Sequence, residues 1–396
     1  MGKLMKNLNK VEAYLLSLIK PETLRKLKKF VPKKLARYIA AINAVVQAYD
    51  RKDESDRLDG IANDYLMRFG LDASDDIIKP MIDNLKTYKA QTDMLSSFSG
   101  FNKIANDMDF KMGVRLAKSM YDYKQWVGVQ PMNGPVSLVY KLSYTYSDKE
   151  FYTDPDLVGR KWSLNVVSTA VEATSRRLRG VVAIESAQDM ASVHGLNVEE
   201  EVLTAMSYEA TQYLEKALFT DLISLSNQDG DIEIVPMEFD VNKILLHLGK
   251  MSNKIAHKTH RSIGNFVIVT PQILSILQTS KAFLPVEKTD LKLSDTTLVG
   301  TLRAQNMKVY CTMNIPDDTV LMGYKGTNTE CDAGYFVAPY IPYIGVTAID
   351  VANFHPTMEG LIRLGLTTND SEVIPASAYY ESCKFNFTQP SETLLG

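Results

Sequence analysis

The segment that most constrains the fold is a long run with almost no helix breaker, EEEVLTAMSYEATQYLEKALFTDLISL at residues 199–225. Asn197 precedes it and can accept a backbone hydrogen bond in the first turn, while Glu200 can reach back toward the start of the helix. This pattern is typical of a capped helix N-terminus. We therefore expect the longest helix of the chain here.

The chain changes character at Tyr123. Before it, in residues 1–123, apolar residues recur at spacings of three and four, with Pro21 and Pro32 as breaks, which predicts a helical arm or helical region. After it, VSLVYKLSYTY and KWSLNVVSTAVEA alternate and are rich in β-branched and aromatic residues, which predicts two strands. The polar connection between them predicts an exposed hairpin tip.

The second half of the chain mixes helices with strands. A helix is expected over 240–258, and GNFVIVTP followed by QILSILQ predicts a buried strand leading into a helix. Short strands are expected from Met307 to Gly365. Within that range the aromatic cluster YFVAPYIPY could stack bases, but Pro339 and Pro342 break the run, so it is interpreted as a packed loop. The fold class is therefore α+β.

Composition describes a globular protein. With 396 residues, of which 45% are hydrophobic, the chain can bury a large core and fill two or three domains. No apolar run of about eighteen residues is present, and the Lys-rich start lacks an apolar signal core, so we expect a cytoplasmic protein. Cys311, Cys331 and Cys383 are expected to be reduced packing residues, because their number is odd and their spacing wide.

Charge is unevenly distributed along the chain. Residues 1–37 hold eleven Lys or Arg against two Glu, a net charge of +9, so the remainder carries −12 within the total of −3. Such a basic arm could contact nucleic acid, a membrane surface or an acidic partner. Solvated helix faces explain it equally well.

One stretch resembles a catalytic or metal site. Residues 176–200, RRLRGVVAIESAQDMASVHGLNVEE, gather Glu185, Asp189 and His194. On a helix, however, Glu185 and Asp189 would form a like-charge pair, and His194 lies five positions beyond Asp189, which does not suit two ligands on one turn. We therefore expect neither a metal nor an acid–base site here.

Other chemical signatures are missing from the sequence. It contains no HExxH, GxSxG, GxxxxGK[ST], CxxC or GxGxxG pattern. Two of its five histidines, His257 and His260, fall at a basic helix end, where they are expected to face helix-end carbonyls or solvent. We accordingly predict no catalytic residue, no metal and no cofactor.

Six ordered blocks resemble the major capsid proteins of T-even-type phages. They are WVGVQPMNGPVSLVYKLSYTY at 126–146, the strand and AQDMASVHG corner at 175–195 that leads into the long helix, GNFVIVTP at 264–271, KVYCTM at 308–313, GYKGTNTECDAGYFVAPYIP at 323–342 and FHPTMEGLIRLGL at 354–366. Together they extend over roughly 240 residues.

The resemblance implies a Hong Kong ninety-seven type capsid fold. It would comprise a helical N-terminal arm or region at 1–123, a peripheral domain at 124–146 and 162–237 that contains the long central helix, and a short hairpin loop (E-loop) at 147–161. An axial domain would follow at 238–345, with a return to the peripheral domain at 346–396.

The resemblance also implies a function. The chain would be a virion protein, assembled in the host cytoplasm into the hexamers and pentamers of an icosahedral head around double-stranded DNA that it binds without sequence specificity. Scaffold, vertex, decoration and portal proteins would be its partners, and no membrane would be involved. Glu185, Asp189 and His194 would then form a structural corner that orients the long helix.

Two further groups of residues are expected to make contacts. The hairpin is expected to reach a neighbouring subunit through Lys149, Glu150, Phe151, Asp154, Asp156, Arg160 and Lys161. The basic arm is expected to hold an acidic scaffold or adjoining subunits, or alternatively genome phosphates, through Arg25, Lys26, Lys28, Lys29, Lys33, Lys34 and Arg37.

The chain departs from the T-even pattern at two places. Relatives carry an inserted domain in the hairpin loop, whereas a short polar segment joins the two strands here. Relatives also lose an N-terminal propeptide to a protease that prefers Leu or Ile two residues before Glu. Glu12, Glu22 and Glu54 are preceded by KV, KP and KD, so none of them fits that preference.

Two alternatives remain open. A capsid vertex paralogue would form pentamers only, and cryo-electron microscopy of particles would identify it. A cytoplasmic α+β enzyme with an unrecognised site would behave as a stable monomer in size-exclusion chromatography, whereas a capsid protein would form rings or shells.

Overall fold

The computed structural model describes most of the chain after residue 53. The described residues are 54–99, 107–146, 162–181, 183, 185, 189–190, 198–228, 230, 232–234, 241–286, 295–303, 306–349, 356–369 and 374–387. Two compact units divide the chain, residues 1–73 and residues 74–396. In the first unit, residues 54–67 form a helix, and the rings of Tyr65 and Phe69 lie 5.3 Å apart.

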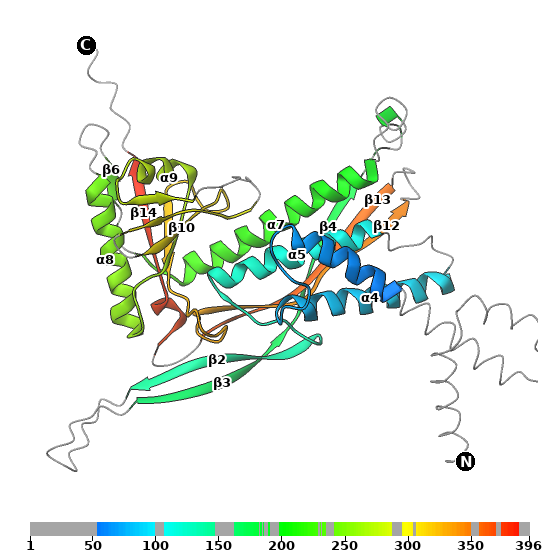
Figure 1. Ribbon diagram of the computed structural model, residues 1–396, viewed down its shortest axis with the longest axis horizontal. Coiled ribbons are helices and arrows are strands. Elements are labelled where there is room, and N and C mark those ends of the chain that lie inside the picture. The colour runs from blue at the N-terminus through cyan, green and yellow to red at the C-terminus, as the bar shows by residue number, and fades with distance from the viewer. Residues whose placement is uncertain are drawn as a thin grey trace, which may run out of the picture. The chain divides into compact units, whose positions relative to one another are not determined.

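The second unit contains two sheets, a two-stranded ribbon and several helices (Figure 1). Its principal helices are α4 (Ile78–Ser99), α5 (Asp107–Asp122), α7 (Val198–Leu225), α8 (Val241–Thr259) and α9 (Pro271–Gln278). A short 3-10 turn, η2 (Tyr123–Gln125), follows α5, and a second, η4 (Ala376–Ala378), precedes the last strand. The ribbon consists of β2 (Val136–Tyr146) and β3 (Trp162–Glu172).

A four-stranded sheet lies beside α4, α5 and α7. Its strands, in spatial order, are β1 (Gly128–Val129), β12 (Tyr335–Ile349), β13 (Pro356–Thr368) and β4 (Thr174–Val181). Leu214 and Leu218 of α7 line a small cavity together with Val337 and Leu364 of this sheet. The central pair of strands, β12 and β13, is antiparallel and long, so it provides a broad surface that the helices can cover.

The second sheet of this unit has eight strands. In spatial order it runs β5 (Asn227–Gln228), β14 (Tyr380–Phe387), β11 (Thr319–Gly323), β7 (Phe266–Val269), β10 (Met307–Cys311), β9 (Thr297–Leu302) and β8 (Phe283–Pro285), with β6 (Ile232–Ile234) paired to β14 beside β5.

Helices α8 and α9 cover one face of this eight-stranded sheet. Apolar residues of α8 recur at the helical spacing, as Ile244, Leu248, Met251 and Ile255, and all four are buried in one cluster with Val267. Helix α9 begins with Pro271 at its first position, where the missing N–H costs no hydrogen bond. One amphipathic helix and one short buried helix therefore complete this core.

The opposite face of the same sheet packs on α7 through aromatic rings. Trp126 is buried, and its ring centroid lies 5.4 Å from that of Phe219 of α7 and 5.4 Å from that of Tyr310 of β10. Gly323 provides the space that Phe266 needs, since a Cβ at Gly323 would lie 2.4 Å from the Phe266 ring. Both faces of this sheet are consequently buried.

Most of the expected elements are confirmed. The helix after residue 197, the helix near 240–258, the strand followed by a helix at 264–278 and the two strands of the ribbon are present, and the fold class is α+β. The three cysteines are free, and Cys311 and Cys383 are buried. None of the described helices is both long and apolar enough to cross a membrane.

The prediction of a packed loop at YFVAPYIPY was wrong. These residues belong to β12, which pairs along its length with β13. The register shifts between Pro339 and Ile341 and again between Ile341 and Ile344, which accommodates prolines that cannot donate to the ladder. The expectation of mostly short strands in this region holds for β10 and β11, which have five residues each, but not for β12 and β13, which have fifteen and thirteen.

The expected domain ranges stay predictions. Strand β12 extends across residue 345, and β14, which follows residue 346, lies in the eight-stranded sheet. The helical character expected before Tyr123 is present in the described residues of that region, at 54–67, in α4 and in α5.

Candidate assembly surface

Near its base the β2–β3 ribbon has one face packed on the body and one face exposed, although Val167 on the packed side is 47% exposed. Directly paired residues share a face, so Val136, Leu138 and Tyr140 lie on the same side as Ala170 and Val166. On this side the relative exposures of Val136, Leu138, Tyr140 and Val166 range from 48% to 61%. We call these four side chains the open ribbon face.

The other face of the ribbon packs on the body of the unit. Val139 and Val171 are diagonal neighbours across the two strands, and both are buried in a cluster with Met132, Phe336 and Ala338. A Cβ at Gly365 would lie 2.4 Å from Val171, so glycine is required for β13 to approach the ribbon this closely. The ribbon is therefore held firmly at its base.

Hydrogen bonds from a side chain and from the backbone hold the edge of β2 near the base of the ribbon. The Gln130 amide donates to the Tyr140 carbonyl at 2.7 Å and accepts from the Tyr140 N–H at 2.9 Å, as a paired strand would. The Leu142 N–H donates to the Cys331 carbonyl at 3.1 Å. These bonds occupy strand-edge groups that would otherwise be available to another strand.

Lys141 anchors the ribbon from its buried side. Its side chain is buried, and its ammonium donates to the Thr367 hydroxyl at 3.0 Å and to the Thr368 carbonyl. Both acceptors lie at the end of β13. Backbone, side-chain and apolar contacts thus hold one face and leave the other free to make contacts.

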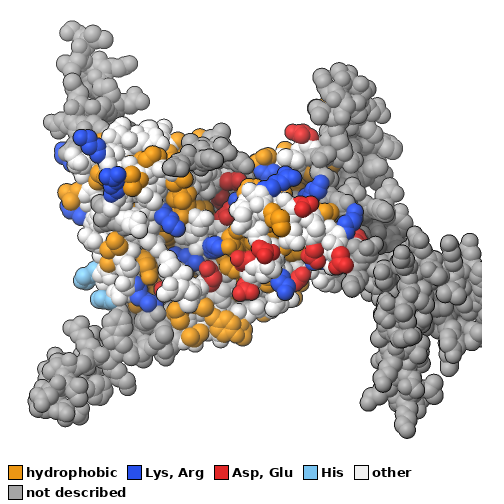
Figure 2. Space-filling view, viewed as in Figure 1, with side chains coloured by type: hydrophobic (Ala, Val, Ile, Leu, Met, Phe, Trp, Pro, Cys, Tyr) orange, Lys and Arg blue, Asp and Glu red, His pale blue; other side chains and the backbone are white. Residues whose placement is uncertain are grey.

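An exposed apolar face on a two-stranded ribbon is a candidate interaction surface. Such a ribbon is marginally stable by itself, and contiguous exposed apolar residues commonly mark contacts between proteins. Burying one side chain of this kind completely contributes about 1.5–3 kcal/mol. Figure 2 shows orange side chains gathered at the lower edge of the described part of the molecule.

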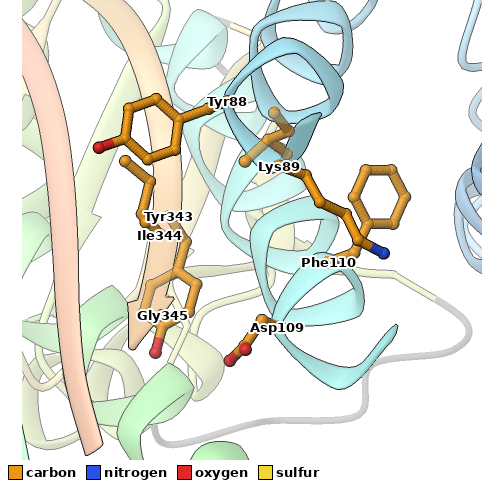
Figure 3. Close-up of a pocket in the computed structure, with 8 residues that line it drawn as sticks. Tyr88, Lys89, Asp109, Phe110, Tyr343, Ile344 and Gly345 are labelled. Carbon is orange, nitrogen blue, oxygen red and sulfur yellow. The ribbon is translucent and has the colours of Figure 1, made fainter. Parts of the chain in front are cut away.

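A small cavity lies elsewhere in the described part of the molecule. It has a volume of about 30 Å³, lies between α4, α5 and β12 and is lined by residues that include Tyr88, Lys89, Asp109 and Tyr343 (Figure 3). A Cβ at Gly345 would lie 2.3 Å from the Asp109 carboxylate, so the space is closely filled. Pockets for small molecules are typically ten times larger or more.

The expected corner residues are only partly described. Glu185 and Asp189 are both exposed, while His194 lies outside the described residues, so their role as a structural corner stays a prediction. The described residues contain no group of three or more His, Cys, Asp or Glu side chains able to hold a metal. His257 and His260 are exposed at the end of α8, with ring centroids 6.0 Å apart.

Neither of the expected contact groups can be placed. The seven hairpin residues named above fall within 147–161, and the seven basic-arm residues fall within 1–53, both outside the described part of the chain. Their roles stay predictions. The aromatic run YFVAPYIPY offers no stacking platform for bases, since Tyr335, Phe336 and Tyr343 are buried.

Sequence reasoning missed the open ribbon face itself. It predicted both strands, and apolar residues at alternate positions 136, 138, 140 and 142 signalled an apolar side. Alternation alone normally means that such a side is packed on the chain's own core. Only the pairing of Val139 and Val171 with the body identifies the side that is left exposed.

Comparison with known proteins gives a consistent result. Residues 152–385 match the family model described as major capsid protein Gp23. Major capsid proteins of Vibrio phage KVP40, Enterobacteria phage T4 and Salmonella phage ViI are 27%, 28% and 28% identical over 244, 227 and 250 residues. These matches cover 54%, 50% and 57% of this chain and 47%, 43% and 56% of the relatives, so the chain spans about half the length of the curated relatives it matches.

Solved structures also match. The capsid of Myoviridae phage XM1 aligns with 65% of this chain and 90% of its own, at a TM-score of 0.40 and 9% identity. The virus-like particle from Pyrococcus furiosus aligns with 69% of this chain and 98% of its own, at a TM-score of 0.42 and 13% identity.

Proposed function

The chain belongs to the Gp23 major capsid protein family, and from that premise we propose that it is the major capsid protein of a tailed bacteriophage. Copies of the chain assemble into the hexamers and pentamers of an icosahedral head that encloses double-stranded DNA. The chain acts by shape and contact rather than by catalysis. Its place is the capsid of the virion, after assembly in the host cytoplasm.

The observation that carries the proposal is the open ribbon face. It is apolar, about half exposed, and attached to a base held by Gln130, Lys141 and the Val139 cluster. A monomer gains nothing from such a surface, whereas a neighbouring copy can bury it. In a closed ring each copy presents one surface to one neighbour and a different surface to the other, so every ribbon finds a partner.

The two sheets correspond to the two domains of a capsid subunit. We assign the four-stranded sheet, the ribbon and α7 to the peripheral domain, and the eight-stranded sheet with α8 and α9 to the axial domain. The axial domain then includes β14, and the peripheral domain includes β12 and β13. The residues that join β2 to β3, 147–161, form the hairpin tip that reaches the neighbouring copy.

The remaining partners follow from assembly of a head. The basic arm, residues 1–37, attracts an acidic scaffold or adjoining copies, and its binding weakens with salt because exposed charges are screened within about 8–10 Å. Vertex, decoration and portal proteins complete the shell, and the enclosed DNA lies nearby without sequence-specific contacts.

Assembly of the purified full-length chain tests this function. Size-exclusion chromatography with light scattering, followed by negative-stain electron microscopy, is expected to reveal rings of five or six copies and closed shells. Rings of five alone would identify a vertex protein instead. A species that stays monomeric at every protein concentration and salt would contradict the proposed function.

A further inference from the structure

The central helix is joined to the eight-stranded sheet by a buried carboxyl group. Glu215 of α7 is 3% exposed, and its carboxylate accepts three kinds of donor from outside the helix. The Thr296 N–H donates to Oε2 at 3.2 Å, the Thr296 hydroxyl at 2.7 Å and the Asn314 side-chain amide at 2.9 Å. Thr296 directly precedes β9, and Asn314 lies just beyond β10.

The two residues that supply these donors, Thr296 and Asn314, lie at the same end of one strand pair. Strands β9 and β10 are antiparallel, and Thr297 pairs with Cys311 there. A single side chain on α7 therefore holds the start of one strand and the turn after the other. We refer to Glu215, Thr296 and Asn314 as the carboxyl strap.

The charged groups around the strap do not neutralise it. In addition to burial, the negative charge of Asp295 raises the pKa of Glu215. Burial and the same charge also raise the pKa of Asp122 at the end of α5. Lys118 pairs with Asp122 rather than with Glu215. From the other elements, Tyr123 of η2 is buried with a pKa raised by burial and by Glu215, while Arg176 of β4 acts on Tyr123.

Burial therefore dominates the ionisation of Glu215. It raises the pKa of this carboxyl from 4.5 to about 7, and the hydrogen bonds from Thr296 and Asn314 only partly oppose it. Both protonation states can be accommodated, since the Thr296 hydroxyl can donate to the carboxylate or accept from the carboxylic acid, and an amide such as Asn314 offers both donor and acceptor atoms.

We propose that the carboxyl strap is a proton-sensitive connection between the central helix and the eight-stranded sheet. With Glu215 protonated, no charge is buried and the strap is closed. Loss of the proton places a negative charge beside Asp295 in a site shielded from water, which loosens the hold on β9 and β10. This step rests on the proposed function: a capsid subunit must adapt the angle between its domains to different rings, and the strap joins α7 to the sheet that we assign to the other domain.

The sign of the pH dependence follows from the direction of the pKa change. Because the pKa of Glu215 is higher in the folded chain than in the unfolded chain, the folded state binds more protons between about pH 4.5 and 7. The stability contributed by the protonated group is fully present below that range and is lost as the pH rises through about 7.

Hydrogen–deuterium exchange on the dilute, unassembled full-length chain tests the proposal without requiring assembly. After correction for the intrinsic pH dependence of amide exchange, protection in residues 295–303 and 306–314 is expected to fall about tenfold between pH 6 and pH 8. Glu215→Gln, which cannot ionise, should remove this pH dependence. Glu209→Gln, which alters an exposed glutamate of the same helix, should behave as the parent chain.

A second variant keeps the test decisive if Glu215→Gln does not fold. Thr296→Val removes the hydroxyl donor that favours the ionised form, so the midpoint of the loss of protection is expected to move to higher pH. The proposal is overturned if the parent chain has equal protection at pH 6 and pH 8. It is equally overturned if Thr296→Val leaves the midpoint unchanged or if Glu215→Gln retains the parent's pH dependence.

Discussion

The ribbon and the eight-stranded sheet contain similar apolar residues, but these residues serve opposite purposes. In β7, Phe266, Val267, Ile268 and Val269 are all buried, because α8 and α9 cover one face and Trp126 and α7 adjoin the other. In β2, Val136, Leu138 and Tyr140 are between 48% and 59% exposed. The sheet completes its own core within one copy, whereas the ribbon needs a surface from elsewhere. The same apolar residue type therefore stabilises the monomer in one region and the assembly in the other.

The largest effect is expected in the self-contained sheet. Phe266→Ala removes a fully buried ring that packs against Gly323 and Tyr380, so the free energy of unfolding should fall by about 3–5 kcal/mol. Chemical denaturation followed by circular dichroism measures this loss. A decrease below about 1 kcal/mol would indicate that this sheet is not a closed core and would remove the contrast with the ribbon.

The ribbon should respond in assembly and not in folding. Leu138→Asp places a charge on the open ribbon face, so the concentration needed for assembly should rise about 10–100-fold, which corresponds to the about 1.5–3 kcal/mol of burial lost per contact. Light scattering against concentration measures the threshold, and thermal unfolding of the monomer should be unchanged within a few degrees.

Leu246→Asp provides the matched control for that variant. Leu246 lies on α8 and, at 62%, is as exposed as the ribbon residues, but it is not part of the ribbon. Its substitution should leave the assembly threshold close to that of the parent chain. Equal impairment by both variants would mean that any added surface charge disturbs assembly and that the ribbon has no special role.

A smaller effect is expected at the base of the ribbon. Gln130→Ala removes two hydrogen bonds to the backbone of Tyr140, each worth about 0.5–1.5 kcal/mol, and frees part of the β2 edge. Amide exchange at Tyr140 should accelerate by about tenfold, while β7 amides should keep their protection. If β7 amides accelerated equally, the ribbon and the sheet would be one cooperative unit rather than two regions.

The smallest effect is expected on the four-stranded sheet. Arg179 and Glu359 approach to 3.8 Å on neighbouring strands, yet both side chains are mostly exposed. Arg179→Ala should therefore change the free energy of unfolding by less than about 1 kcal/mol. Thermal unfolding of Arg179→Ala beside the parent chain measures this, and a larger loss would show that β4 is held by its charges rather than by its packing on α7.

Local patterns predicted the elements that depend on local periodicity. The helical spacing of Ile244, Leu248 and Met251 and the alternation of β2 can be read directly from the sequence. The prolines of β12 led to a wrong prediction. A strand tolerates them only where its register shifts, and this shift depends on the pairing with β13.

Long-range placement could not be predicted from such patterns. Strand β14 joins β11 from about sixty residues away, and β4 joins β13 across nearly two hundred, so the division of the two sheets along the chain was beyond local reasoning. Glu215 gave no signal either, since one glutamate in a long helix is ordinarily exposed. Recognition of the family came from ordered blocks of residues, which report ancestry and not geometry.

Cysteine labelling at Val166 tests the central claim most directly. Val166→Cys places a thiol on the open ribbon face, where the parent side chain is 61% exposed, and the parent chain corrects for labelling of Cys311, Cys331 and Cys383. If a neighbouring copy covers this face, maleimide should label the thiol rapidly in the unassembled chain and far more slowly in assembled particles. Equal labelling rates in both states would contradict the account, because the ribbon would then remain uncovered in the shell.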